Sequence, residues 1–166
     1  RISDSLGANA GTVITNTGEM THATGPLTTT PPVSTTVGEP SLALDKWSTP
    51  PTSHTVGAGD RVTYTVLITN VGDASGPAPA YDLVFTDTLP VGMRDGTPLL
   101  LAVTLDSAPV SSALYTTTYD SSSGIYAIVF TPTFAFSLPV GSVLGIEYVA
   151  LVDADIAAGM DLANAA

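Results

Sequence analysis

The chain has 166 residues, of which 15 are acidic and only four are Lys or Arg, so its net charge is −11. A field of that sign repels phosphate backbones and anionic lipid, which argues against binding to nucleic acid or a membrane surface, and no apolar run is long enough for membrane insertion. Charged residues make up only 11 % of the chain and 44 % is hydrophobic, so there is enough apolar material for a folded core.

Residues 1–24 form the first predicted unit, an N-terminal β-segment. Residues 5–18 align with residues 155–166 when a two-residue insertion is allowed. Each stretch is a small-residue turn followed by an apolar strand that carries an asparagine, Asn16 in the first and Asn164 in the second. The segment therefore looks like the last strand of a preceding repeat unit. The alternative is a chance similarity between two strands rich in Ala and Gly.

Residues 25–40 form a predicted Pro/Thr-rich linker. Prolines and β-branched threonines favour an extended chain that acts as a semi-rigid connector. The linker separates the predicted strand 12–20 from the domain that follows, and an isolated strand cannot satisfy its backbone hydrogen bonds. We therefore expect this strand to complete the previous repeat, or to be donated to an open sheet edge of another subunit. A flexible tail is the competing expectation.

Residues 41–166 form the main predicted domain, in which apolar and polar residues alternate with a period of two. Turns rich in Gly, Pro, Asp and Ser separate the expected strands. These strands are 41–48, 61–70, 81–88, 99–106, 113–119, 124–131, 142–152 and a short one at 160–165. Many short strands without a long helical pattern predict an all-β fold, an antiparallel β-sandwich.

Several short motifs of this domain occur in an order that resembles a known family. They are Leu44-Asp-Lys46, the run 56–66, Thr69-Asn-Val-Gly72, Val84-Phe-Thr-Asp-Thr-Leu-Pro90 with Gly92, and the closing stretches 146–150 and 162–165. Together they look like the DUF11-type repeat of bacterial and archaeal surface proteins. The resemblance implies an Ig-like sandwich used in adhesins, surface coats and filaments. Related fimbrial isopeptide domains join a first-strand Lys to a last-strand Asn with the help of a buried Asp or Glu.

Three polar residues fall on strand faces that are otherwise apolar. Side chains two residues apart on a strand point to the same side of the sheet. Lys46 shares this parity with Leu42 and Leu44, Asp87 with Leu83 and Phe85, and Asn164 with Met160 and Leu162. Each polar group would be costly to bury alone. We therefore expect the three to lie together in the core.

Placed together, these side chains form a reactive set. Burial disfavours charged groups, so Lys46 is expected to become a neutral, nucleophilic amine and a protonated Asp87 to polarise the amide of Asn164. Asp87 would act only in this autocatalytic step, passing a proton to the departing ammonia. The product is an amide between Lys46 and Asn164, or between Lys46 and Asn16 of another subunit if the strand is donated. The competing interpretation is an edge lysine paired with Asp87, its stem covering apolar surface.

The predicted function is structural. We expect a subunit or repeat module of an extracellular filament, sheath or surface array, with other copies of the same protein as partners. The abundance of Thr, Ser, Gly and Pro and the scarcity of Lys favour the cell surface. The alternative is an adhesin, a module that binds cell-surface glycans or a host protein. No enzyme active site, metal or cofactor is expected, since there is no Gly-x-Ser-x-Gly motif and His22 and His54 lack further ligands at a suitable spacing.

Overall fold

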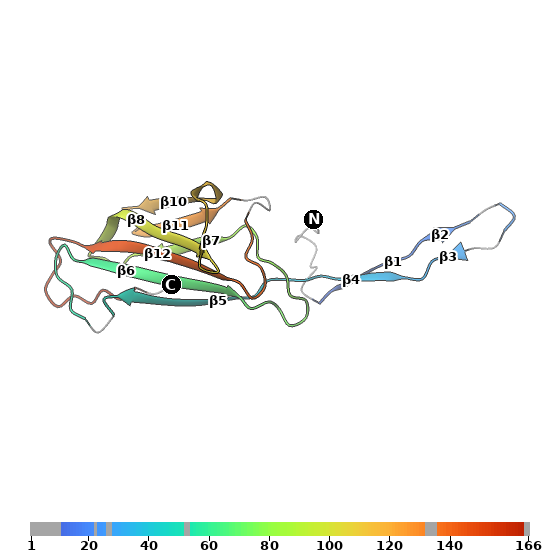
Figure 1. The fold of residues 1–166 in the computed structure, drawn as a ribbon, viewed down its shortest axis with the longest axis horizontal. Helices are drawn as coiled ribbons and strands as arrows, with labels where there is room; N and C mark the ends of the chain where they lie inside the picture. The colour runs from blue at the N-terminus through green and yellow to red at the C-terminus, as the bar shows by residue number, and fades with distance from the viewer. Residues whose placement is uncertain (1–10, 22, 26–27, 52–53, 132–135, 165–166) are drawn as a thin grey trace.

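The computed structural model shows a β-sandwich from which a narrow two-stranded arm projects (Figure 1). It describes residues 11–21, 23–25, 28–51, 54–131 and 136–164. The first ten residues of the predicted N-terminal segment, His22, and the end of the predicted strand 160–165 lie outside these ranges. In the described part of the chain the regular structure is all β apart from one 3-10 turn, η2 (Ser112–Leu114), and no helix there is long and apolar enough to cross a membrane.

The arm is a hairpin formed by the described residues between 11 and 37. Its strands are β1 (Val13–Asn16), β2 (Glu19–Met20), β3 (Thr28–Thr29) and β4 (Val33–Thr36), with β1 antiparallel to β4 and β2 antiparallel to β3. The structure therefore differs from the sequence prediction, because half of the expected linker folds back and pairs with the expected lone strand. β-Branched Val and Thr suit a strand as well as an extended connector, and pairing satisfies the backbone groups that a single strand leaves open.

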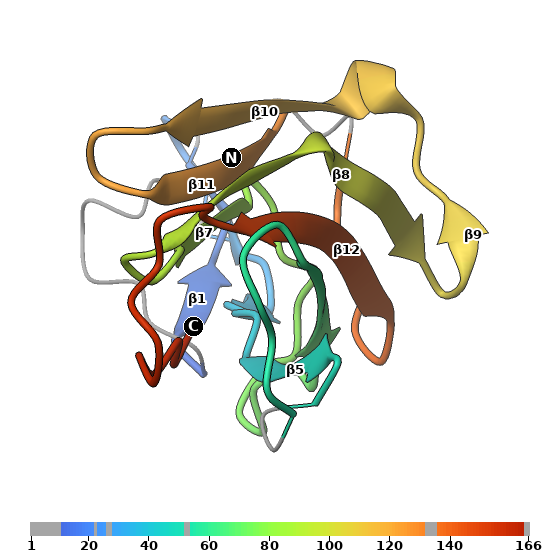
Figure 2. The ribbon, with the colours of Figure 1, turned by 90° about the vertical axis from the view of Figure 1, so that its left-hand side faces the viewer.

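Two antiparallel sheets form the sandwich, seen along the long axis of the molecule in Figure 2. The larger sheet has the order β5 (Leu42–Thr49), β6 (Arg61–Asn70), β12 (Val143–Val152), β8 (Met93–Leu105), β9 (Ala108–Pro109). The smaller sheet has the order β10 (Tyr115–Asp120), β11 (Ile125–Phe130), β7 (Val84–Thr88). The prediction of an all-β, Ig-like antiparallel sandwich is confirmed.

The core lies between the sheets and follows the period-two alternation of the central strands. In β6 and β12 every second residue points inward, and β7 and β11 supply the opposing layer. The buried side chains include Val62, Tyr64, Val66, Phe85, Tyr126, Ile128, Phe130, Leu144, Ile146 and Tyr148. Each large apolar side chain buried in this way contributes about 1.5–3 kcal/mol.

The last predicted strand, 160–165, does not form over residues 160–164. The chain after β12 makes turns instead, with Met160 N donating to Ala157 O at 3.2 Å and Gly159 at a φ of 81°. A left-handed glycine and local turn hydrogen bonds stop the chain from extending along a neighbouring strand. Leu162 still packs against the core, whereas Met160 is exposed, so only part of the predicted inward face exists.

The arm joins the sandwich beside a buried asparagine, Asn70, at the end of β6. Its amide nitrogen donates to the carbonyls of Ala78 and Leu138, at 2.9 and 3.0 Å. Its amide oxygen accepts from the backbone N–H groups of Gly72 and Ser41, at 3.0 and 3.3 Å. One buried side chain thereby ties together the segment that leaves the arm and two loops of the sandwich.

The backbones of the arm and the sandwich approach closely at two glycines. Glu39 N donates to Gly76 O at 2.7 Å, and Ala78 N donates to Glu39 O at 3.2 Å. A Cβ atom on Gly76 would lie 2.5 Å from Val37 O, and one on Gly38 would lie 2.9 Å from Gly76 O. Only residues without a side chain allow the two backbones to come this close. The glycines therefore belong to the contact that attaches the arm to the sandwich.

Candidate functional site

Three side chains that are far apart in the sequence meet at one carboxylate. Lys46 on β5 places Nζ 2.6 Å from Asp87 Oδ1, and Asn164 in the C-terminal segment places Nδ2 2.9 Å from Asp87 Oδ2. Asp87 lies on β7 in the opposite sheet. The fold thus assembles the three residues that sequence parity singled out, with the acid between the amine and the amide.

The carboxylate at the centre of the site is almost completely buried. Asp87 is 2 % exposed and lies on the inner face of β7 with Phe85, as the alternation of that strand predicts. The Lys46 side chain is 9 % exposed. A buried charge of this kind persists only when it is paired and hydrogen-bonded, because desolvation costs several kcal/mol.

The inner face predicted for β5 is only partly correct. Leu42 and Leu44, which share parity with Lys46, are each 47 % exposed. β5 is the edge strand of the larger sheet, and the opposing sheet is only three strands wide. The smaller sheet does not cover the whole edge strand, so the buried part of this face is the part around Lys46.

Two tyrosines that the sequence did not single out complete the site. Tyr148 on β12 donates its hydroxyl hydrogen to Asp87 Oδ2. Tyr64 lies directly opposite Tyr148 in the β6–β12 pair, and the two rings stack with centroids 5.4 Å apart. Lys46 Nζ lies 5.1 Å from the centroid of the Tyr64 ring. The sequence offered one sign of these two tyrosines, their position on the inward faces of β6 and β12. An ordinary aromatic residue of the core has the same position, so this sign did not mark them as part of the site.

The tyrosine hydroxyls at the site remain protonated. Burial raises the pKa of Tyr148 far above its ordinary value, and its hydrogen bond to Asp87 and the charge of that carboxylate raise it further. Burial also raises the pKa of Tyr64, whose hydroxyl donates to Met93 Sδ at 3.2 Å, while the neighbouring Asn164 amide lowers that pKa by a smaller amount. Tyr148 therefore acts as a permanent hydrogen-bond donor to the carboxylate.

The amide of Asn164 presents its nitrogen, not its carbonyl oxygen, to Asp87. The sequence prediction, that a protonated Asp87 polarises the carboxamide of Asn164, did not specify which amide atom faces the acid. An amide nitrogen donates hydrogen bonds and a carboxyl oxygen accepts them, so Asn164 occupies one oxygen of Asp87 while Lys46 occupies the other. Asn164 Oδ1 is buried and has no hydrogen-bond partner among the described residues. The arrangement places the nitrogen that would leave in a substitution at Cγ beside the acid.

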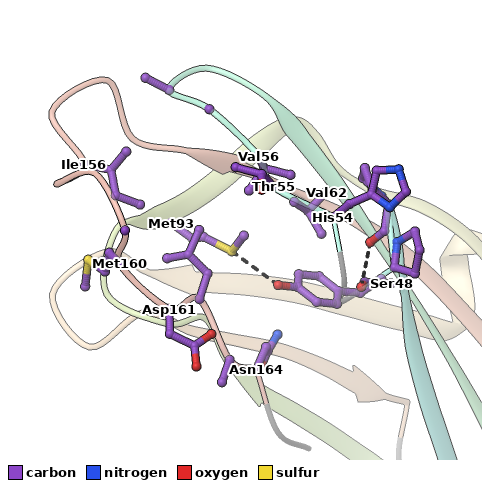
Figure 3. A pocket seen from close by; sticks show the side chains of 18 of the residues that line it. Ser48, His54, Thr55, Val56, Val62, Met93, Ile156, Met160, Asp161 and Asn164 are labelled. Atoms are coloured by element: carbon purple, nitrogen blue, oxygen red, sulfur yellow. Dashed lines mark hydrogen bonds between the residues drawn. The ribbon is translucent and has the colours of Figure 1, made fainter.

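A cavity of about 930 Å³ opens next to this site (Figure 3). Its walls come from β5, the loop 54–58, β6, the start of β8 and the C-terminal segment 156–164. Lys46, Tyr64 and Asn164 all contribute to them. In Figure 3, Ile156 lies across the cavity from Val56 and Val62, whereas the side chain of Met160 points away from them. A small leaving molecule such as ammonia thus has space beside Asn164.

The other candidate residues lie away from this carboxylate. Asn16 is on β1 in the exposed arm, opposite Val33, and the chain does not bring it to its own Lys46. His54 lines the cavity, and His22 lies outside the described residues. Within the described ranges there is no cluster of three or more His, Cys, Asp or Glu side chains that would suit a metal ion.

Comparison with known proteins identifies the fold. No protein-family model and no curated protein matches the sequence, so the DUF11 resemblance gains no support from a family model. Among solved structures, the pilus backbone protein RrgB of Streptococcus pneumoniae is 16 % identical, with a TM-score of 0.50 over 68 % of this chain and 27 % of RrgB. A full-length RrgB structure has 17 % identity and a TM-score of 0.49, covering 87 % of this chain and 26 % of RrgB.

The major pilin SpaA of Corynebacterium diphtheriae is similar at a lower level, with 18 % identity and a TM-score of 0.45 over 74 % of this chain and 29 % of SpaA. Its structure is described as pointing to a modular pilus assembly with stabilising isopeptide bonds. This chain spans little more than a quarter of the length of RrgB. The RrgB match defines the class of fold, an Ig-like β-sandwich of the kind found in a pilus backbone protein.

Proposed function

We propose that this chain is a structural, non-enzymatic module of an extracellular filament or surface array, stabilised by an amide bond between Lys46 and Asn164. The observation that carries the proposal is the Asp87 carboxylate, which holds Lys46 Nζ on one oxygen and Asn164 Nδ2 on the other. The fold, which is similar to that of a pilus backbone protein, supports it. The net charge of −11 and the absence of cysteine are compatible with a covalent staple other than a disulfide in an exported protein.

The proposed reaction is an amide exchange. Asp87 Oδ1 accepts a proton from the Lys46 ammonium, which leaves a neutral amine. Nζ attacks Asn164 Cγ, the Cγ–Nδ2 bond breaks, and Nδ2 departs as ammonia after receiving the amine's proton through Asp87. The acid returns its remaining proton to ammonia, so that ammonium leaves and the carboxylate is regenerated. By analogy with a disulfide, a bond that closes a loop of about 100 residues stabilises the fold by about 4–5 kcal/mol.

Intact-mass spectrometry of the folded protein tests this proposal. Loss of ammonia lowers the mass by about 17 Da relative to the sequence. Asp87→Ala should keep the full mass, because the proton carrier is gone, and Asp45→Ala, which removes an exposed acid from the same strand as Lys46, should show the wild-type loss. A peptide that joins residues 46 and 164 identifies the bond. Full mass in the folded wild type contradicts the proposal.

We also propose that the arm packs against a neighbouring module, either the previous repeat of a longer chain or another copy. All described residues of β1, β2 and β4 are exposed, including Val13, Ile14, Met20 and Val33. A two-stranded hairpin with nothing packed on it is marginally stable in water. In this form of strand complementation the donated element is a hairpin. The open edge of β5 is a suitable acceptor, because its exposed Leu42 and Leu44 are apolar like the exposed side chains of the arm.

Substitutions on the arm test the self-association. Val33→Ser combined with Val13→Ser removes apolar side chains without shortening the arm, and Thr15→Ser is the matched control at an exposed polar position. We expect the double variant to assemble less than the wild type in sedimentation and electron microscopy. Equal assembly of all three proteins overturns the proposal. A cross-link between Asn16 of one copy and Lys46 of another would appear as covalent multimers, each a multiple of the chain mass less about 17 Da per bond. This separates the alternative from the internal bond.

The cavity supports a second candidate function, binding of a cell-surface glycan. Trp47 and His54 both line it, and Trp47 is partly exposed. An exposed indole offers a face on which a sugar ring can stack. A glycan array probed with the wild type and with Trp47→Ala tests this function. Binding that disappears in the variant favours the adhesin interpretation, and absence of binding by the wild type removes it.

A further inference from the structure

The hydroxyl of Tyr148 contacts the one oxygen of Asp87 that also faces the amide of Asn164. Oδ2 accepts from Tyr148 and from Asn164 Nδ2 at 2.9 Å, while Oδ1 accepts from Lys46 Nζ at 2.6 Å. The two oxygens of the carboxylate therefore have different partners. One faces the amine that would attack and the other faces the nitrogen that would leave.

The ring of Tyr148 is held from several sides. It stacks on Tyr64 at 5.4 Å and contacts the rings of Tyr126 and Phe85, with centroids 5.0 and 6.1 Å away. Tyr148 is fully buried, and the pairing of β12 with β8 shifts register on both sides of it while its pairing with β6 stays regular. Irregularities of this kind fix the direction of a side chain. The hydroxyl of Tyr148, on the larger sheet, is thus held in one position, from which it contacts Asp87 on the smaller sheet.

A carboxylate without such a donor can turn about its last side-chain torsion, which is a soft one. A half turn only exchanges two equivalent oxygens, but any smaller rotation moves them out of the plane in which they face the Lys46 amine and the Asn164 amide. The rate of the reaction depends on how the acid, the amine and the amide are oriented in the transition state, and a small misplacement of one of these groups reduces that rate strongly. We propose that Tyr148 is a positioning residue for the cross-linking reaction. Its hydroxyl holds the plane of the Asp87 carboxylate so that Oδ1 faces Lys46 and Oδ2 faces Asn164, and the inference rests on the cross-link of the proposed function.

A neighbouring tyrosine shows that this contact is specific. Tyr126 lies opposite Asp87 in the β11–β7 pair and is as deeply buried as Tyr148. Its hydroxyl has no hydrogen-bond partner in the described structure. Removing the hydroxyl of Tyr126 therefore makes the same chemical change in the same core without touching the carboxylate. Tyr126→Phe is the matched control for Tyr148→Phe.

The test measures the rate of ammonia loss in the folded protein. The full chain and its variants are purified under denaturing conditions in the unlinked form and refolded, and the intact mass is followed over time. Far-UV circular dichroism establishes that each variant is folded before the rate is taken. We expect Tyr148→Phe to slow the reaction on the order of tenfold, the effect of one hydrogen bond of ordinary strength, and Tyr126→Phe to react at the wild-type rate.

Two further variants separate positioning from a structural role. 3-Fluorotyrosine at position 148 keeps the hydroxyl and should restore the wild-type rate, whereas 4-fluorophenylalanine fills the same space without a donor and should stay slow. The second replacement also provides the comparison if Tyr148→Phe does not fold. A folded Tyr148→Phe that reacts as fast as Tyr126→Phe overturns the role of Tyr148 and leaves the cross-link intact. A wild type that never loses ammonia overturns the cross-link itself, and the role of Tyr148 with it.

Discussion

Lys46 and Asp87 join the two sheets of the sandwich through a contact of 2.6 Å between Nζ and Oδ1. Lys46 is on the edge strand β5 of the larger sheet and Asp87 is on β7 of the smaller one. The pair is therefore an inter-sheet connection at the rim of the core, where few apolar contacts hold β5. Its strength depends on burial, because exposed ion pairs contribute little.

The first prediction concerns removal of the acid. In a chain that already carries Asn164→Ala, Asp87→Ala leaves the Lys46 ammonium and the Tyr148 hydroxyl without their partner. Breaking a buried pair costs about 3–5 kcal/mol. The measurement compares the double variant Asp87→Ala/Asn164→Ala with Asn164→Ala alone, since no cross-link can form in either protein. We expect urea unfolding to show a loss of this size in the free energy of unfolding.

The control for this prediction is Asp45→Ala in the same background. Asp45 lies one residue before Lys46 and is exposed, so its loss should change the free energy of unfolding by no more than about 0.5 kcal/mol. Equal losses for the two variants would mean that the Lys46–Asp87 pair adds nothing to stability.

The alternation of polar and apolar residues was sufficient to predict the centre of the fold. The predicted strand 61–70 coincides with β6, and the predicted strand 142–152 differs from β12 by one residue. Asp87 lies on the inner face of β7 as parity requires. These strands are central or opposed by a full sheet, so burial enforces the pattern that the sequence displays.

The other features of the fold and the site depend on contacts between distant parts of the chain, which the pattern of neighbouring residues does not reveal. The exposure of Leu42 and Leu44 follows from the width of the opposite sheet, and the pairing of β1 with β4 follows from how the chain returns. Asn164 reaches Asp87 from a segment without regular secondary structure, not from a strand. The hydroxyl of Tyr148 is bound by an acid 61 residues earlier in the chain, and nothing in the residues around Tyr148 marks that contact.

The second prediction concerns the hydrogen-bond centre at the base of the arm. Asn70→Ala removes four hydrogen bonds at once and leaves two carbonyls and two N–H groups without this partner. Since an unsatisfied buried group costs about 1–3 kcal/mol, we expect a loss of about 2–5 kcal/mol in chemical unfolding. Asn16→Ala, at an exposed position on β1, should leave stability within about 0.5 kcal/mol of the wild type. Equal stability of the two variants would contradict the role assigned to Asn70.

The third prediction concerns the close approach at Gly76. In Gly76→Ala the new Cβ atom would lie 2.5 Å from Val37 O, so the arm must move away from the loop that holds it. We expect faster amide hydrogen exchange at residues 37–41 and easier proteolytic removal of the arm, while the sandwich stays folded. Gly57→Ala is the control, because its nearest atom, Asp60 Oδ2, lies at an ordinary 3.6 Å. Unchanged exchange in Gly76→Ala would show that the contact is not required.

The last prediction is a loss of stability at alkaline pH. Burial raises the pKa of Tyr148, Tyr126 and Tyr64 above the ordinary value of 10.0. A group with a raised pKa in the folded state contributes its full stability below the unfolded pKa and loses it as pH rises from there toward the folded pKa. The protein should therefore be stable up to about pH 10 and weaken progressively above it, since the unfolded chain releases these phenolic protons first. Following tyrosinate absorbance and far-UV circular dichroism in one titration tests this, with Tyr126→Phe as the variant that should weaken less steeply. Ionisation of all the tyrosines near pH 10 in a protein that keeps its strand signal would contradict the burial of these hydroxyls.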